Sequence, residues 1–409
     1  MSTILLKNEQ GLRFGYTTGS CATAAAAAAA QMLLCGDEVA VVTFLTPKGI
    51  ELSLDIEDIH VVHYDRKQAV TDQMRKNCAP FWEINRQSVR CGVKKDAGDD
   101  PDITDGIYVY AIAELSDEPG VQIEGGIGVG RVTRPGLDQP VGAAAINHVP
   151  REMITREVTR VMALAHYDGG IRITIEIPEG VTLAAKTFNP RLGIEGGISV
   201  LGTSGIVEPM SEEALKATIR TELSVRRAEG YQDVILVPGN YGLDFLKERV
   251  MSRDALKNRS PYMCSSVGER QLQTGNTIDE ESAVKCSNFI GDAIDMAAAL
   301  GFTEVLLIGH IGKLIKLSGG IFNTHSRQAD ARIDLLVSAG VRADVSQEVL
   351  KMLFDAVTTE DALRILDEHH MLCPVVDVVK ERVDYYLRQR AGDKLQIRAI
   401  LFSNVYGEL

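Results

Sequence analysis

The segment DVILVPGN at 233–240 has four apolar residues in a row, then proline, glycine and asparagine, and the helix-forming YGLDFLKERV follows at 241–250. EVLLIGH at 304–310 repeats the arrangement and ends in the glycine loop GHIGK. Short continuous apolar runs are typical of strands that are buried on both faces of a parallel sheet. The carboxyl ends of two such strands share one edge, where open sheets of this kind bind ligands.

Elements on either side extend the alternation of strand and helix. ISVLG (198–202) predicts a further strand that ends at the same edge, in the loop LGTSG. Apolar patterns predict helices and strands over the remaining chain, namely helices at 211–230, 288–300, 325–339 and 375–391, and strands at YMCSSV (262–267) and LQIRAILFS (395–403). Alternation of this sort predicts a Rossmann-like α/β domain with a parallel sheet over residues 193–409.

Residues 1–192 have a different pattern. A helix is expected over 21–35, because the hydroxyl of Thr17, Thr18 or Ser20 can cap its first turn, and a second helix is expected at 151–166. Strands are predicted in a series without regular intervening helices, at EVAVVTFLT (38–46), IELSLDI (50–56), HVVHYD (60–65), IYVYAIAEL (107–115) and IRITIEI (171–177). This order predicts an α+β domain.

Charge and cysteine usage exclude several classes of protein. The 409 residues carry 43 basic and 56 acidic side chains, a net charge of −13, which disfavours general binding to nucleic acid or to anionic membranes. The apolar stretch CATAAAAAAAQMLLC (21–35) is shorter than the roughly 20 residues that span a bilayer. Seven scattered cysteines without a C-x-x-C pair indicate free thiols in a reducing compartment. We therefore expect a cytoplasmic protein.

The loop KKDAGDDPDITDG (94–106) has the highest density of charge. It contains five aspartates, Asp96, Asp99, Asp100, Asp102 and Asp105. Crowded carboxylates need protons, cations or hydrogen-bond donors nearby. A divalent-cation site, a proton acceptor, a binder of N–H donors and a merely solvated acidic turn all remain open, although the spacing does not fit a calcium EF-hand.

Two glycine-rich loops could bind ligands. GGIGVGRVTRPG (125–136) does not match the dinucleotide fingerprint, but Arg131 and Arg134 suit the capture of carboxylates, and a surface hairpin is the alternative. LGTSG (201–205) and VPGN (237–240) offer backbone N–H groups and hydroxyls for a nucleoside-type ligand. His310, at the end of a predicted strand, could exchange a proton near neutral pH or be structural.

Together these segments resemble the CbiD family of anaerobic cobalamin biosynthesis, the cobalt-precorrin-5B C-1 methyltransferases. The matching strings are GYTTGSCATAAAAAA, KKDAGDDPDITDG, GVGRVTRPGL, NPRLGIEGGISVLGTSGIVEP, VPGNYG and IGHIGKLIKLSGGIFNTHSRQADAR, in family order from residue 15 to residue 332. The resemblance implies a two-domain fold and the transfer of a methyl group from S-adenosylmethionine, as co-substrate, to a corrinoid. Cobalt belongs to the substrate, so no metal site on the protein is expected.

The resemblance also suggests roles for residues. Corrinoid contacts are expected in residues 1–192, from Thr17, Thr18, Ser20, Lys95, Asp96, Arg131, Arg134 and Arg191. Donor contacts are expected in residues 193–409, from Gly202, Thr203, Ser204, Gly205, Pro238, Gly239, Asn240, Gly309 and Lys313. Asp99 or Asp100 is the expected proton acceptor, with His310 as the second choice. Transient contact with other enzymes of the pathway and a homo-oligomer remain open.

Two other functions remain open. A non-catalytic corrinoid carrier or pathway scaffold would explain the missing donor fingerprint. A nucleotide-dependent oxidoreductase would rest on the glycine loops alone.

Overall fold

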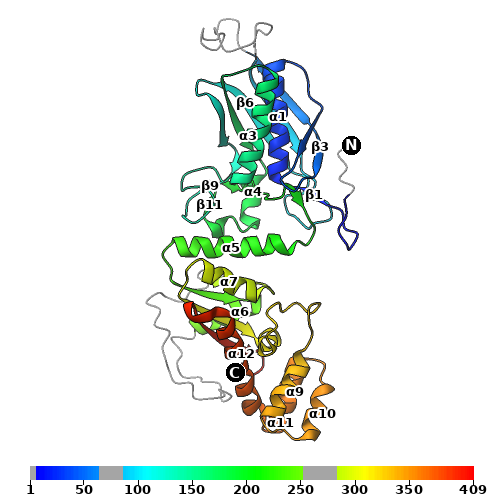
Figure 1. Ribbon diagram of the computed structural model, residues 1–409, viewed down its shortest axis with the longest axis vertical. Helices are drawn as coiled ribbons and strands as arrows, with labels where there is room; N and C mark the ends of the chain where they lie inside the picture. Colours follow the sequence, from blue (N-terminus) through cyan, green and yellow to red (C-terminus); the bar gives the residue numbers. More distant parts are fainter. Residues whose placement is uncertain (1–5, 64–85, 252–282) are drawn as a thin grey trace. The chain divides into compact units, whose positions relative to one another are not determined.

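The computed structural model describes residues 6–63, 86–251 and 283–409. The chain divides into two compact units, Met1–Glu212 and Glu213–Leu409 (Figure 1). The first is an α+β arrangement around a mixed sheet, and the second is an α/β arrangement around a mostly parallel sheet. The strand predicted at 262–267 lies outside the described residues.

The N-terminal unit is built on a five-stranded mixed sheet. Its order is β4 (Glu57–His63), β5 (Arg86–Lys94), β6 (Tyr108–Ser116), β10 (Gly170–Glu176) and β7 (Gly120–Gly125). β6 runs antiparallel to β5 and β10, whereas β10 runs parallel to β7. β5 and β7 were not predicted, although Val89, Cys91 and Val93 of β5 are buried at every second position, which is typical of a strand.

Helix α1 (Thr18–Cys35) lies against β5 and β6 and beside α3 (His148–Leu164), as Figure 1 shows. Its run of alanines from Ala24 to Ala30 is buried, because methyl side chains let the helix backbone approach its neighbours closely. Among the described residues, α1 is the one helix long and apolar enough to cross a membrane, but 89% of it is buried inside the unit. A core helix meets those criteria equally well.

The N-terminal cap of α1 is Thr17, whose Oγ1 accepts the backbone N–H of Ser20 at 3.2 Å. We expect Thr17→Val to lower the free energy of unfolding of the N-terminal unit by about 1 kcal/mol, because that N–H loses its partner. Urea titration followed by hydrogen exchange of peptides from α1 measures the change. Thr43→Val at an exposed position of β2 (Val41–Leu45), where the hydroxyl bonds that of Ser53 at the surface, is the control, with an expected effect below about 0.5 kcal/mol. Equal effects of the two substitutions would contradict the capping role.

Short strand pairs attach residues 193–212 to the N-terminal unit. β11 (Ile194–Glu195) pairs with β9 (Arg131–Val132), β12 (Gly197–Ile198) with β8 (Gly128–Val129), and β13 (Ile206–Val207) with β1 (Gly15–Tyr16). The remaining elements of this unit are β2 (Val41–Leu45), β3 (Glu51–Asp55), α4 (Gly180–Leu183), η1 (Ala184–Lys186) and η2 (Pro190–Leu192). The division of the chain therefore falls between 212 and 213, whereas the sequence placed it between 192 and 193.

The C-terminal unit has a five-stranded sheet. Its order is β15 (Ala283–Lys285), β14 (Asp233–Val237), β16 (Glu304–His310), β17 (Gln396–Ser403) and β18 (Gly407–Glu408). The first four strands are parallel and β18 is antiparallel. ISVLG, predicted as a strand of this sheet, is not part of it, because residues 197 and 198 pair with β8 in the other unit.

Both faces of the C-terminal sheet are covered. Leu236 and Leu307 pack in a core with residues of α7 (Ile290–Ala299) and α12 (Leu372–Ala391), while Ile235 and Leu306 face Leu243 of α6 (Asn240–Met251). This explains the continuous apolar runs in β14 and β16.

The remaining helical segments are α5 (Glu212–Ala228), α8 (Ile311–Leu314), η5 (Ile315–Gly319), α9 (Arg332–Arg342), α10 (Gln347–Phe354), α11 (Thr359–Glu368) and η6 (Gly392–Lys394). The helix predicted at 325–339 begins only at Arg332. His325 forms a local turn instead, because its Nδ1 accepts the N–H of Arg327 at 3.1 Å. α10 and α11 were not predicted.

Candidate functional site

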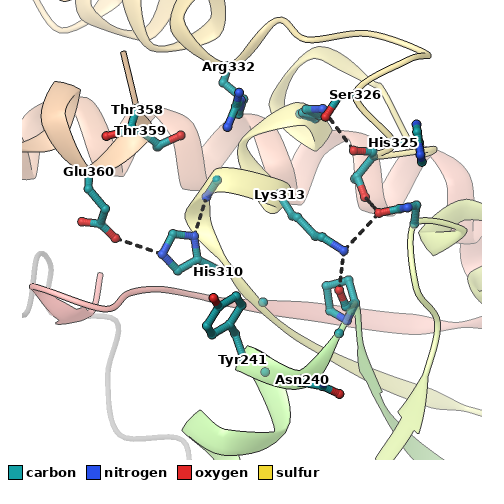
Figure 2. Close-up of a pocket in the computed structure, with 18 residues that line it drawn as sticks. Asn240, Tyr241, His310, Lys313, His325, Ser326, Arg332, Thr358, Thr359 and Glu360 are labelled. Atoms are coloured by element: carbon teal, nitrogen blue, oxygen red, sulfur yellow. Dashed lines mark hydrogen bonds and ion pairs between the residues drawn. The ribbon is translucent and has the colours of Figure 1, made fainter. Parts of the chain in front are cut away.

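The C-terminal unit contains a pocket of about 840 Å³ at the carboxyl ends of β14 and β16 (Figure 2). Its lining comes from five parts of the chain: 238–242 after β14, Asn288, 309–316, 324–332 and 358–360. Pockets between about 300 and 1,000 Å³ hold most small ligands. The position agrees with the expectation that adjacent parallel strands present their carboxyl ends at one edge.

His310 ends β16 and caps the short helix α8. Its Nδ1 accepts the N–H of Gly312 at 3.0 Å, and its Nε2 lies 2.9 Å from Oε1 of Glu360. Because Nδ1 is an acceptor here, Nε2 carries the hydrogen and donates it to the Glu360 carboxylate. Both ring nitrogens are therefore engaged, and His310 could accept a proton only by giving up the bond to Gly312. The role predicted for it stays a prediction.

Glu360 is in turn bound by residues at the end of β17. Ser403 donates its hydroxyl to Glu360 at 2.7 and 2.9 Å, and the N–H of Asn404 donates at 3.2 Å. The carboxylate is thus committed to several donors that fix it beside His310, as Figure 2 shows for the pair.

Two lysines in the pocket wall are shielded from water, Lys316 fully and Lys313 in part. Lys313, at the centre of Figure 2, donates from Nζ to the carbonyl of Pro238 at 2.7 Å and to Oδ1 of Asn288 at 3.0 Å. Lys316 is 2% exposed and donates to the carbonyl of Thr324 at 3.0 Å. Burial lowers the pKa of both amines, and in the described part of the chain neither has a carboxylate oxygen within 4.0 Å.

Arg332 and Thr359 complete this wall. The guanidinium of Arg332 is paired with Asp330 through bonds of 2.7 and 3.0 Å, so its charge is already compensated. Thr359 is 4% exposed, and its Oγ1 is buried without a hydrogen-bond partner among the residues that the structure describes. Thr358, one position earlier, caps α11 by accepting the N–H of Asp361 at 3.1 Å.

The acidic loop lies in the N-terminal unit, where hydrogen-bond donors satisfy it. Arg13 binds Asp96 through two bonds of 2.5 and 2.9 Å, and the bond lowers the pKa of that carboxyl. Lys95, 3% exposed, forms an ion pair with Asp102. Lys95 and Asp96, both predicted to contact the corrinoid, are therefore already paired with charged groups of the protein. No group of three or more His, Cys, Asp or Glu suited to a metal ion occurs in the described ranges.

The two predicted proton acceptors in this loop are each bound through one oxygen. Oδ2 of Asp99 accepts the N–H of Arg13 at 2.6 Å, and Oδ1 of Asp100 accepts the N–H of Met210 at 2.9 Å. The second oxygen of each has no hydrogen bond within the described part of the chain and remains able to accept a proton.

The other predicted corrinoid contacts lie in the same unit. Arg131 donates to Glu124 at 2.8 Å and to the carbonyl of Gly125 at 3.1 Å. The stem of Arg134 covers Gly193, where a Cβ would lie 2.4 Å from its Cγ, and Arg191 is part of η2. These arginines surround the short strand pairs β8–β12 and β9–β11.

The predicted donor contacts are divided between the two units. Pro238, Gly239, Asn240, Gly309 and Lys313 line the pocket, as predicted for one strand edge. Gly202, Thr203, Ser204 and Gly205 lie instead in the N-terminal unit, because residues 193–212 pair with its strands.

This loop is held at the start of α1. The carbonyl of Gly205 accepts the hydroxyl of Ser20 at 2.6 Å and the N–H of Thr17, and Thr18 bonds both backbone groups of Leu201. Two of the three hydroxyls predicted to bind substrate, those of Thr18 and Ser20, therefore hold the LGTSG loop instead. At Gly202, with φ of +139°, a Cβ would lie 2.4 Å from Oγ1 of Thr17, so only glycine fits there.

Thr359, Glu360 and Arg332 were not predicted as site residues. They come from α9 and α11, which begin well after the end of β16 and are separated from it in sequence by other helical segments. The sequence pattern that could have drawn attention to this segment is the spacing of Thr358 and Asp361, which is typical of a helix N-terminus.

Comparison with known proteins gives consistent results along the chain. A sequence model of the CbiD family matches residues 5–209, and a model described as the CbiD C-terminal domain matches residues 323–409. The cobalt-precorrin-5B C(1)-methyltransferase of Ruminiclostridium cellulolyticum is 40% identical over 409 residues, which cover 100% of this chain and 94% of the relative. The protein of the same name from Thermoanaerobacter sp. is 40% identical over 404 residues, 98% and 96% of the two chains.

One similar solved structure is a cobalamin biosynthesis protein (cbiD) from Archaeoglobus fulgidus. It is 23% identical, with a TM-score of 0.38, and the match covers 81% of this chain and 88% of the other.

Proposed function

The chain belongs to the CbiD family, and from that premise we propose that it transfers a methyl group from S-adenosylmethionine to C-1 of cobalt-precorrin-5B. The observation that carries this proposal is the identity of about 40% along the whole chain with curated proteins named for that reaction. Cobalt enters as part of the substrate.

We place the methyl donor in the pocket of the C-terminal unit, a Rossmann-like lobe in this proposal. The parallel order of β15, β14, β16 and β17 supports the placement, as do the helices on both sheet faces. Tyr241, 67% exposed, stands beside the pocket with its ring centroid 6.3 Å from that of His310. It offers a flat apolar surface for an adenine. Gly239, with φ of +136°, leaves the backbone of the strand-end loop open to a ligand.

We place the corrinoid on the N-terminal unit. Arg131, Arg134 and Arg191 suit its carboxylates, because a guanidinium binds a carboxylate through two parallel bonds. Arg131 would exchange its present bonds to Glu124 and the carbonyl of Gly125 for a bond to the substrate. The methyl group then moves in line from the sulfonium to C-1, so most of the acceleration comes from alignment of the two substrates. The free oxygen of Asp99 or Asp100 takes up a proton that leaves the macrocycle.

The test is methyl transfer itself. The chain is incubated with cobalt-precorrin-5B and methyl-deuterated S-adenosylmethionine under anaerobic conditions, and the product is analysed by mass spectrometry. We expect the corrinoid to gain one labelled methyl group for each S-adenosylhomocysteine formed, and a reaction with unlabelled donor is the matched control. Binding of the corrinoid without methyl transfer would favour the carrier alternative instead.

A further inference from the structure

We propose that the pocket wall formed by Lys313, Lys316 and Thr359 is a subsite for a carboxylate group of a ligand. This inference deepens the proposed function and rests on it, since it states which chemical group of the reactants the pocket recognises. The proposed placement makes the amino-acid part of the methyl donor the expected source of that group. The acidic side chains of the corrinoid are the other source, and their binding here would overturn the placement of the corrinoid on the N-terminal unit.

The two lysines have donors to spare. An ammonium group has three N–H bonds. Within the described residues, Lys313 uses two of them, on Pro238 and Asn288, and Lys316 uses one, on Thr324. Buried polar hydrogens are almost always paired. A carboxylate in the pocket would accept the remaining N–H bonds and supply the missing opposite charge, and so would offset the cost of burying two cations.

Thr359 gives an independent indication of a ligand. Its Oγ1 is buried, unpartnered among the described residues, and located where it lines the pocket. A Cβ on Gly312 would lie 3.5 Å from this oxygen, which places the hydroxyl next to the start of α8. Thr359 is also the first residue of the ten-residue helix α11, whose N-terminus favours an anion. A ligand oxygen is the natural partner for this hydroxyl.

The charges around the pocket favour an anion over a cation. Glu360 is its one lining carboxylate in the described ranges, and it is already bound by His310, Ser403 and Asn404. Arg332 is compensated by Asp330, which leaves Lys313 and Lys316 as the pocket cations without an ion pair in the part of the chain that the structure describes. Both reactants carry carboxylates and neither carries a phosphate, so a carboxylate is the anion that the reaction brings to this wall.

Binding calorimetry on the full chain tests the subsite with two pairs of probes. S-adenosylhomocysteine is compared with 5′-methylthioadenosine, which lacks the amino-acid carboxylate. Cobyrinic acid is compared with its heptamethyl ester, in which every carboxylate is neutralised. The variants are Lys316→Met and Thr359→Val, and Lys351→Met on the exposed side of α10 is the charge-matched control. Thr359→Val should fold normally, because the hydroxyl that it removes has no hydrogen-bond partner among residues 6–63, 86–251 and 283–409.

We expect Lys316→Met to weaken binding of one acid, and not of its neutral counterpart, by about 10- to 100-fold, the value of a lost charged hydrogen bond. Thr359→Val should weaken the same acid by roughly fivefold to tenfold. The affected pair identifies the donor or the corrinoid as the source. Equal losses for the acid and the neutral probe, or no loss for either acid, would overturn the subsite while leaving the proposed function standing.

If the unmutated chain binds neither pair, the proposed function fails, and a small anion still tests the subsite. Succinate is compared with sodium chloride at equal ionic strength by thermal shift. A rise in the melting temperature in the unmutated chain and in Lys351→Met, but not in Lys316→Met, supports the subsite. The same response in all three proteins overturns it.

Discussion

Replacement of Asp102 by asparagine is expected to lower the free energy of unfolding of the N-terminal unit by about 3–5 kcal/mol, the cost of leaving one partner of a buried ion pair uncompensated. The partner left behind is Lys95, whose side chain is 2% exposed. Asparagine keeps an oxygen that can accept the N–H and hydroxyl of Thr104, so the loop itself should persist. The decrease in the free energy of unfolding therefore measures the contribution of the negative charge of Asp102 and not that of its shape.

Replacement of the other partner of the ion pair provides the control. Lys95→Met removes the buried ammonium and leaves Asp102, 26% exposed, with Thr104 and water as partners, so the expected loss is only about 1 kcal/mol. The double variant should be more stable than Asp102→Asn alone, because no unpaired charge remains. Urea-dependent hydrogen exchange of N-terminal peptides measures all three. Equal losses in the two single variants would show that the pair is not effectively buried.

The same pair gives the unit a defined acid sensitivity. Burial acts to raise the pKa of Asp102, but the charge and hydrogen bond of Lys95, with Thr104, outweigh it and hold the pKa below its ordinary value of 3.8. A carboxyl with a depressed folded pKa contributes stability above its unfolded pKa and loses it as pH falls towards the folded value. The stability difference between the unmutated chain and Asp102→Asn should therefore shrink as pH falls below about 4.

The sequence was most informative where one local pattern had one structural meaning. The continuous apolar runs of β14 and β16 occur because both faces of their sheet are covered, so their type and position were predicted correctly. ISVLG has a similar apolar run, but only Ile198 pairs with β8 and Val200 forms a single bridge with Ile146, and these two side chains pack in the core of the other unit. A run that short does not indicate which sheet it joins. For that reason the predicted domain boundary, between 192 and 193, differs from the division between 212 and 213 in the structure.

The pocket shows the same limit. The positions of His310 and Lys313 in the pocket lining could be expected, because both residues lie at or just after the end of a strand that the sequence predicts. Thr359 and Glu360 reach the pocket through the packing of α11 against α8, a tertiary contact without a sequence signal. The pairing of Asp96 was equally hidden, because its partner Arg13 is far away in sequence, whereas Lys95 pairs with Asp102 in its own loop.

Asp100→Asn is expected to reduce the rate of methyl transfer by about 100- to 10,000-fold, the contribution of a positioned general base. The amide oxygen of asparagine can still accept the N–H of Met210, so folding and S-adenosylhomocysteine affinity should change little. Only the ability of the second oxygen to take a proton is lost. The measurement is single-turnover conversion of cobalt-precorrin-5B, with the melting temperature recorded for the same preparations.

Asp99→Asn and Asp105→Asn are the matched variants, because each of these loop aspartates also accepts one backbone N–H, from Arg13 and Ala97 respectively, and keeps a second oxygen. If Asp100 is the acceptor, its variant alone should lose turnover at unchanged donor affinity. A loss confined to Asp99→Asn would move the role to that neighbour. Near-normal rates in all three would remove the acidic loop from the chemistry, and proton transfer would then require His310 to release the N–H of Gly312.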